Sequence, residues 1–253
     1  MKKKKIKNPL IKRIPKELIG DWKKYLVVFL FLVLTIGFVS GMYVANESMI
    51  TSANEGVTKY KQEDGHFELK KQADATLLSA IETGEKADFK ATKTTLYENF
   101  FRNEEEDYNN DGKKDGTIRV FAKTKDINLA CMLQGSFPQK ADEIAIDRMH
   151  ADNVGIKVGD TVTVSGETYK VVGLLAYVNY STLHEKTTDL MFDALKFDVA
   201  MVTQGGFDRL HKSIHYTYAW KYETEPADEA GEKTRSDNFM RALLTQLSLI
   251  HIS

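Results

Sequence analysis

Cysteine is almost absent from this sequence, which has a single one, Cys131, in 253 residues. One cysteine cannot form an internal disulfide bond, so a disulfide-stabilised framework is excluded. A chain of this length can bury enough apolar surface to fold without such a bond. Cys131 lies in the apolar stretch 127–133, where we expect a small buried residue.

Motifs for catalysis and for nucleotide binding are also absent from the sequence. The residues between Gly155 and Gly159 lack the Lys-Ser or Lys-Thr of a phosphate-binding loop, and there is no nucleophile elbow. Five of the six histidines show no recognised metal-ligand spacing: His66, His150, His184, His211 and His215. The sequence therefore predicts no catalytic, cofactor-binding or metal-ligating residue, no cofactor and no enzymatic activity of this chain.

Only one long apolar run is present, Tyr25–Ala45, and it contains no charged residue. About 20 apolar residues in a helix cross a hydrocarbon core of roughly 30 Å. Trp22 and Tyr25 lie at one end of the run and Tyr43 at the other, where aromatic rings favour the lipid headgroups. We predict one transmembrane helix. A cleavable signal peptide is the competing interpretation, but its apolar core is normally shorter, and Asn46–Met49 makes a poor cleavage site.

Acidic residues are scarce at the N-terminus. Residues 1–24 contain ten basic and two acidic side chains, a net charge of +8, and residues 25–253 carry −9. A basic arm that leads directly into an apolar run favours a membrane as its partner and argues against nucleic acid. Because lysine and arginine stay on the cytoplasmic side, we expect the N-terminus inside and the main domain outside the membrane.

The basic arm includes an amphipathic segment, Pro9–Lys24, whose apolar residues recur at helical spacing. Such a segment is suited to lie along the inner headgroups, and a disordered basic anchor is the alternative. The stretch after the apolar run has no proline and predicts a helical stalk. We therefore divide the chain into a cytoplasmic segment, a transmembrane helix, a stalk, an extracytoplasmic domain and a short terminal segment: 1–24, 25–45, 46–63, 64–246 and 247–253.

The outer part alternates irregularly between strand-like and helix-like segments, which predicts an α+β fold with a mixed α/β domain. Strand patterns occur at 65–70, 90–102, 117–123, 143–146, 158–164, 169–172, 197–203 and 215–222. Helical composition occurs at 73–81, 147–154, 205–210 and 226–244. Gly155 stops the second of these helices. We expect a charged turn at 104–116 inside a hairpin, and a tight turn at 165–167.

The charged turn carries a partial calcium-loop pattern, with oxygen ligands and glycine at Asp107, Asn109, Asp111, Gly112 and Asp115. The twelfth position, which needs a bidentate carboxylate, is Ile118. The flanking segments are strand-like, whereas calcium loops of this kind lie between helices. An exposed turn explains the composition equally well, because Asn, Asp and Gly supply turn geometry. Calcium binding by the Asp107–Asp115 loop stays an open alternative.

Four aromatic residues alternate at period two near the end of the outer part: Tyr216, Tyr218, Trp220 and Tyr222. This spacing places four rings on one face of a strand. We expect them to pack within a sheet, and a binding surface is the alternative.

One stretch carries a resemblance to a known family. Gly135–Tyr177 reads GSFPQKADEIAIDRMHADNVGIKVGDTVTVSGETYKVVGLLAY. It resembles the FtsX/MacB-type ABC transporter permeases, in which the matching positions are Gly135, Pro138, Glu143-Ile144, Gly159-Asp160 and Val171-Val172-Gly173. Tyr180–Leu210 also looks like the continuation found in Firmicutes-like members. Each piece is short, so the specificity comes from their order behind a membrane helix.

The resemblance implies an outer domain like the MacB periplasmic core domain, in a permease subunit at a bacterial plasma membrane. Such permeases pair with an ABC-type ATP-binding subunit and commonly with a second permease subunit. They transmit the motion of the ATPase to the outer domain, for export or extrusion of peptides, lipoproteins or drugs. Hydrolysis of ATP then belongs to the partner subunit, and the substrate is not specified by these residues.

Members of this family have three further membrane helices after the outer domain, which this sequence lacks. Leu247–Ser253 reads LSLIHIS, similar to the translation of a transposase end sequence used in library preparation. We expect the genuine sequence to end near Gln246, as part of a longer permease. The alternative function is a single-pass, membrane-anchored extracytoplasmic sensor or binding protein, which needs no further helices.

Overall fold

The computed structural model describes residues 19–83, 94–180, 182–186, 188–224 and 226–250. The chain divides into two compact units, Met1–Glu55 and Gly56–Ser253. Each unit is described by itself below.

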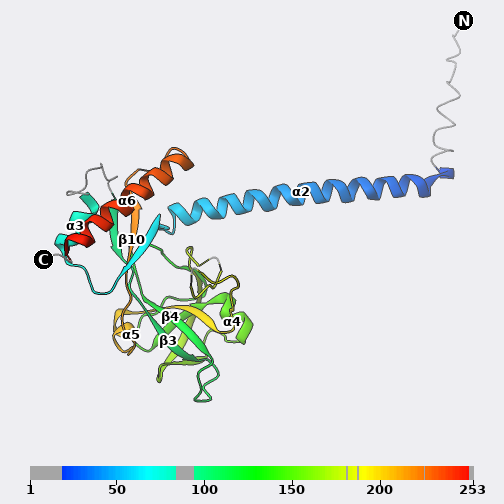
Figure 1. The fold of residues 1–253 in the computed structure, drawn as a ribbon. Helices are drawn as coiled ribbons and strands as arrows, with labels where there is room; N and C mark the ends of the chain where they lie inside the picture. Colours follow the sequence, from blue (N-terminus) through cyan, green and yellow to red (C-terminus); the bar gives the residue numbers. More distant parts are fainter. Residues whose placement is uncertain (1–18, 84–93, 181, 187, 225, 251–253) are drawn as a thin grey trace, which may run out of the picture. The chain divides into compact units, whose positions relative to one another are not determined.

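Helix α2 is the main element of the first unit and runs from Trp22 to Thr58 (Figure 1). Its apolar window has a mean hydropathy of 2.4, and none of that window is buried. Within the described residues it is the one helix that is long and apolar enough to cross a membrane, a test that an N-terminal signal sequence also meets. The helix ends five residues before the predicted end of the stalk, where Gln62 N–H donates to Gly56 O and Lys61 has a positive φ.

The second unit contains two sheets. The smaller one is antiparallel, in the order β1-β10-β2, with β1 at Gly65–Leu69, β10 at Tyr216–Tyr222 and β2 at Thr94–Glu98. Helices α3 (Ala75–Thr83) and α6 (Glu229–Ile250) contact each other beside this sheet (Figure 1). We call these five elements the terminal lobe. Its core is made of Ile81, Trp220, Tyr222, Phe239 and Leu243.

The larger sheet has the order β5-β8-β6-β9-β4-β3-β7, and β7 also pairs with β8. Six strands therefore close into a ring, and β5 is added outside it on β8. We call this ring the barrel; it leaves no open strand edge within the ring. The bounds are Phe101–Asp107 for β3, Gly116–Ala122 for β4, Cys131–Gly135 for β5, Glu143–Asp147 for β6, Thr161–Val164 for β7, Glu167–Ala176 for β8 and Phe197–Val202 for β9.

Side chains alternate between two apolar clusters along the barrel strands, as the period of a strand requires. One cluster draws on five of the six strands and fills the interior; it includes Ile118, Ile146, Val162, Val171 and Val202. The other lies outside and includes Phe121, Leu175, Val199 and Met201. Strand β3 contributes Glu104 and Glu106 to the inner face, because they lie directly opposite Ile118 and Gly116 of β4.

Two short helices cover the barrel. Helix α4 (Arg148–Val154) begins at Asp147, whose carboxylate accepts a hydrogen bond from Met149 N–H, and ends at Gly155 with φ +84°. Helix α5 (Gln204–Asp208) begins in the same way at Thr203. Both fit the positions predicted from sequence, and the α+β class is confirmed by this mixture of two sheets and covering helices.

Four predicted boundaries were wrong. The strand predicted at 90–102 is two strands in different sheets, because Asn99 N–H bonds to Thr217 O and Phe101 N–H to His215 O as the chain crosses between them. Its first residues lie outside the described part. The charged turn is shorter than 104–116, since Glu104 and Glu106 belong to β3. Val158 precedes β7, and helix α6 continues beyond 244 to Ile250.

Candidate functional site

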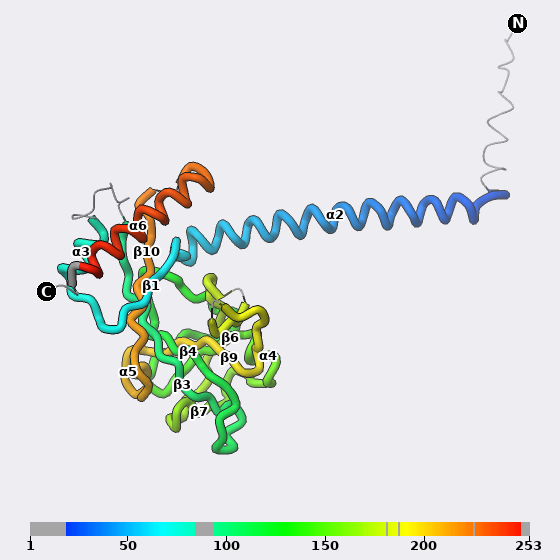
Figure 2. The backbone as a smooth tube through the Cα atoms, in the orientation of Figure 1, coloured from blue at the N-terminus to red at the C-terminus, as the bar shows by residue number. Residues whose placement is uncertain are grey.

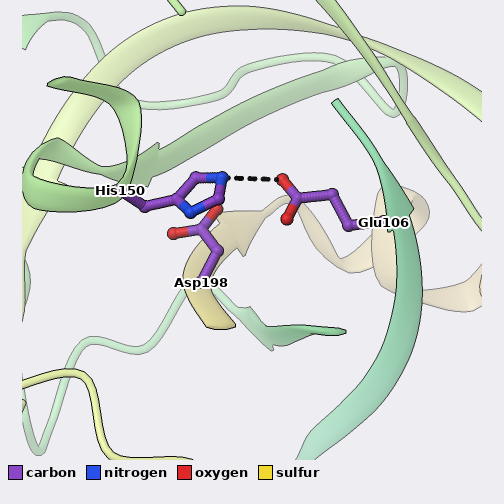
Figure 3. A group of neighbouring side chains, drawn as sticks. All are labelled: Glu106, His150 and Asp198. Carbon is purple, nitrogen blue, oxygen red and sulfur yellow. Dashed lines mark ion pairs between the residues drawn. The ribbon is translucent and has the colours of Figure 1, made fainter. Parts of the chain in front are cut away.

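Three ionisable side chains converge at the barrel: Glu106 of β3, His150 of α4 and Asp198 of β9 (Figure 3). All three have 0% exposure to solvent. One possible ligand atom of each lies within 4.8 Å of the others. Within the described residues they are the one group of this kind.

The backbone holds two of these side chains in fixed orientations. Asp198 Oδ1 accepts hydrogen bonds from Asp147 N–H at 3.1 Å and from Val199 N–H at 2.7 Å. His150 Nδ1 lies 2.7 Å from Ala194 O. A carbonyl oxygen can only accept, so Nδ1 carries the proton and the other ring nitrogen, Nε2, faces the carboxylates.

The remaining polar atoms of the cluster have few partners. His150 Nε2 lies 3.3 Å from Glu106 Oε1 as an ion pair (Figure 3). Both oxygens of Glu106, Oδ2 of Asp198 and Nε2 of His150 form no hydrogen bond with any described residue. Buried polar atoms normally have such partners, so the arrangement is costly unless another species binds to it.

The electrostatics reflect an excess of negative charge. Burial raises the pKa of Asp198 well above its ordinary value. Burial alone lowers the pKa of His150, but the neighbouring carboxylates Asp198 and Glu106 outweigh it and raise the pKa to about 9. The pKa of Asp147 is also raised, chiefly by burial. The site therefore attracts positive charge, as protons or as a cation.

Sequence reasoning did not identify this cluster, because its three members stand far apart and meet only through the barrel. Glu106 is hidden in a run of acidic residues, and His150 has no neighbouring ligand in sequence. One usable signal is Asp198, a single charge within the apolar strand FDVAMV. A lone carboxylate in a strand that is buried along its whole length indicates a partner elsewhere.

The segment Asp107–Asp115 before β4, which we call the acidic loop, is held by hydrogen bonds between its carboxylates and its own backbone N–H groups. Asp107 accepts hydrogen bonds from Asp111 N–H and Gly112 N–H, and Asp115 accepts one from Tyr108 N–H. Ile118, at the twelfth position of the calcium pattern, is fully buried in β4. These contacts are those of an Asx-type polar turn.

The other histidines are separated from one another. His66 pairs with Glu63 at 2.7 Å, and His215 pairs with Glu68 at 2.9 Å. His211 lies 3.9 Å from Glu167. His211 and His215 are four residues apart in the sequence, but they pair with different carboxylates, Glu167 and Glu68. The two histidines therefore do not form one metal site.

The aromatic strand and the cysteine have structural surroundings. Tyr218 stacks on Phe67 at 5.6 Å, and Trp220 packs on Phe239 at 4.5 Å. The rings of β10 thus pack in the terminal lobe, as expected. Cys131 is half-buried, not fully buried, because β5 lies outside the ring; its sulfur accepts a hydrogen bond from the Tyr60 hydroxyl at 2.9 Å.

Comparisons with known proteins give structural neighbours. No family model and no curated protein matches the chain. The periplasmic region of MacB from Actinobacillus actinomycetemcomitans is similar at 9% identity and a TM-score of 0.35, over 62% of this chain and 70% of that one. The extracellular domain of the noncanonic ABC-type transporter YknZ from Gram-positive bacteria is similar at 13% identity and a TM-score of 0.36, over 73% and 95%.

Proposed function

We propose that this chain is the N-terminal part of a permease subunit of an FtsX/MacB-type ABC transporter. In this proposal α2 crosses the plasma membrane with the basic arm inside. The second unit is the extracytoplasmic domain. An ABC-type ATP-binding subunit acts on the cytoplasmic side, together with a second permease subunit. The domain uses the transmitted motion to export or extrude peptides, lipoproteins or drugs.

The observation that carries this proposal is the return of the chain to its starting point in the second unit. Strand β10 is antiparallel to β1, and Gly65 pairs with Trp220 (Figure 2). Beyond that pair, Asp64 accepts a hydrogen bond from Tyr222 N–H at 2.6 Å and pairs with Lys221 at 2.8 Å. Asp64 follows the end of α2 by only six residues. A domain inserted between two membrane helices needs this geometry, whereas a domain at the end of a single anchor does not.

The residues that carry the family resemblance support the fold of that domain. Gly135 has φ +77°, and a Cβ there would lie 2.2 Å from Val172 O. A Cβ at Gly173, its partner in the β5–β8 pair, would lie 2.5 Å from Ser136 O. Glu143 accepts hydrogen bonds from Gln139 N–H and Lys140 N–H after Pro138. These positions join β5, which lies outside the ring, to strands β8 and β6 of the barrel, so the order of the motif follows from the order of its strands.

The alternative is a single-pass sensor or binding protein with the same outer domain. A polar pocket of about 150 Å³ lies in the second unit; its lining includes Glu63, His66, Glu68, Arg119 and Tyr180. The Arg119 guanidinium is already occupied there: it donates to Asn103, Tyr180 and the carbonyl of Glu185. A pocket whose central cation is satisfied within the protein offers little to a ligand, which favours the permease.

Orientation is tested with cysteine labelling in a Cys131→Ser background. We expect Asn110→Cys to react with a membrane-impermeant maleimide in intact cells. Lys7→Cys is expected to react only after the cells are permeabilised. Labelling of Lys7→Cys in intact cells would overturn the proposed orientation.

The partner is tested by affinity purification of the full-length gene product from its native membrane. We expect an ABC-type ATP-binding subunit to co-purify in a fixed ratio, and a neighbouring gene for such a subunit to be present. A second variant replaces Lys23 and Lys24 by glutamate, which reverses the charge in the first turn of α2. Repeated absence of an ATPase from the purified full-length protein would favour the sensor.

A further inference from the structure

The buried cluster has the geometry of a metal-ligand set. In a tetrahedral site with bonds of about 2.0–2.1 Å, neighbouring ligand atoms are separated by roughly 3.3–3.5 Å. His150 Nε2 and Glu106 Oε1 already lie 3.3 Å apart. All three donor atoms fall within 4.8 Å of one another. Side-chain adjustments of about one ångström bring them to bonding distance.

The contacts around the donors match those that support metal ligands. A ligating histidine normally donates its second ring N–H to a carbonyl or carboxylate, which fixes its tautomer. His150 does so through Nδ1 to Ala194 O. Asp198 is held in the same way, because Asp147 and Val199 bind Oδ1 and leave Oδ2 for the site. The two held side chains thus each keep one atom, His150 Nε2 and Asp198 Oδ2, that forms no hydrogen bond with a described residue.

Charge balance points to a divalent ion. Two carboxylates and a neutral imidazole carry a charge of −2 in a region with no exposure to solvent. Within the described part of the chain, no lysine or arginine forms an ion pair with Glu106 or Asp198. A divalent cation neutralises this charge in place of two protons.

We propose that Glu106, His150 and Asp198 bind one Zn²⁺ ion. A set of one imidazole nitrogen and carboxylate oxygens is within the ligands that zinc accepts, and the second oxygen of a carboxylate supplies a fourth bond. Calcium and magnesium are less suitable, because they take mainly oxygen ligands and higher coordination numbers. This site departs from the expectation of no metal ligands, and it is independent of the proposed transport function.

The role that follows is structural. The three ligands belong to β3, α4 and β9, so the ion joins the covering helix to two strands of the barrel. None of the three is exposed, so a substrate has no access to the ion. Zinc is expected to raise the melting temperature of the outer domain by roughly 5–15 °C, from mass action on a chain of this size.

The wild-type test uses the full chain in detergent micelles, stripped with a chelator and dialysed against Zn²⁺, Mn²⁺ or Ca²⁺. Bound metal is counted by mass spectrometry, and unfolding is followed with and without metal. We expect one Zn²⁺ per chain. X-ray absorption should show one imidazole among nitrogen and oxygen neighbours. No bound metal and a melting temperature unaffected by metal would overturn the proposal without any variant.

Variants locate the site. Glu106→Gln and Asp198→Asn keep side-chain shape and remove one negative charge each. We expect them to lose bound zinc and its stabilising effect, with a metal-free melting temperature equal to or above that of the wild type. A buried ion pair without metal gives the opposite result, because removing one partner lowers the metal-free melting temperature.

Matched controls separate this site from the other candidate ligands. His66→Gln removes a histidine of the terminal lobe, and Asp111→Asn removes a carboxylate of the acidic loop. Both are expected to keep one zinc per chain. Zinc that is retained in Glu106→Gln and lost in Asp111→Asn would place the ion in the acidic loop and contradict the proposal.

Discussion

The terminal lobe and the barrel differ in which parts of the chain form them and in what fills their interiors. The barrel strands lie within one continuous stretch, 101–202, and two of the six strand pairs in the ring, β3–β4 and β7–β8, are local hairpins. The terminal lobe joins β1, α3 and β2 to β10 and α6, which come from the two ends of the second unit. The barrel encloses buried acids and a histidine, whereas the lobe is filled by aromatic rings. We infer that the barrel is a self-contained insert and that the lobe is the part through which the chain enters and leaves it.

The largest expected effect is in the aromatic core of the lobe. Phe239→Ala removes a fully buried ring that packs on Trp220, and should lower the free energy of unfolding of the lobe by about 3–5 kcal/mol. Amide hydrogen exchange measures this in the lobe and barrel separately. The adjacent Met240→Ala, which is exposed, should change stability by under about 0.5 kcal/mol. Equal loss of protection in the barrel would mean that the two parts unfold as one.

The next effect is at the contact between β5 and the barrel strand β8. Gly135→Ala places a Cβ 2.2 Å from Val172 O at a φ of +77°, and should cost about 2–4 kcal/mol through strain and overpacking. Gly205→Ala in helix α5 is the control, because the atom nearest to the new Cβ would be the Cβ of Ala141 at 3.4 Å, an ordinary contact distance. Denaturant unfolding compares the two. A neutral Gly135→Ala would contradict the role given to the motif glycines.

A smaller effect is expected at the start of α4. Asp147→Ala removes the side-chain acceptor for Met149 N–H, which should cost about 0.5–2 kcal/mol in thermal unfolding. Asp147→Asn keeps an acceptor and should retain most of that stability. If the asparagine variant loses as much as the alanine variant, the contribution of Asp147 is not that of a helix cap.

The smallest effect is a pH dependence of the lobe. The hydrogen bond to Glu63 raises the pKa of His66, against the opposing effects of burial and Arg119, with a further contribution from Glu68. The stability from this pair is present below the ordinary histidine pKa and is lost as the pH rises through the raised pKa. It should be under about 1 kcal/mol, because the His66 side chain is half-exposed and solvent screens the pair. His66→Gln should remove this pH dependence from the free energy of unfolding measured between pH 6 and 9. If the variant keeps the pH profile of the wild type, the pH dependence comes from another group.

The sequence could predict local features and missed those that depend on distant contacts. The helix of 148–154 with its stop at Gly155 and the β3–β4 hairpin follow from neighbouring residues, and the structure has both. The split of 90–102 into two strands depends on Thr217 and His215, more than a hundred residues away. The cluster of Glu106, His150 and Asp198 depends on ring closure through β7 and β8. No periodicity encodes such pairings.

The most direct test of the account measures whether ATP moves the outer domain. The full-length subunit with its ATPase, in nanodiscs, is compared by hydrogen exchange with and without a non-hydrolysable ATP analogue. We expect protection to change in β1, β10 and α6 of the terminal lobe and to stay constant in the barrel. Ser52→Pro, which breaks α2, should abolish the change, and Ser52→Ala should keep it. An ATPase that binds the analogue while no amide of the outer domain changes would contradict the proposed transmission.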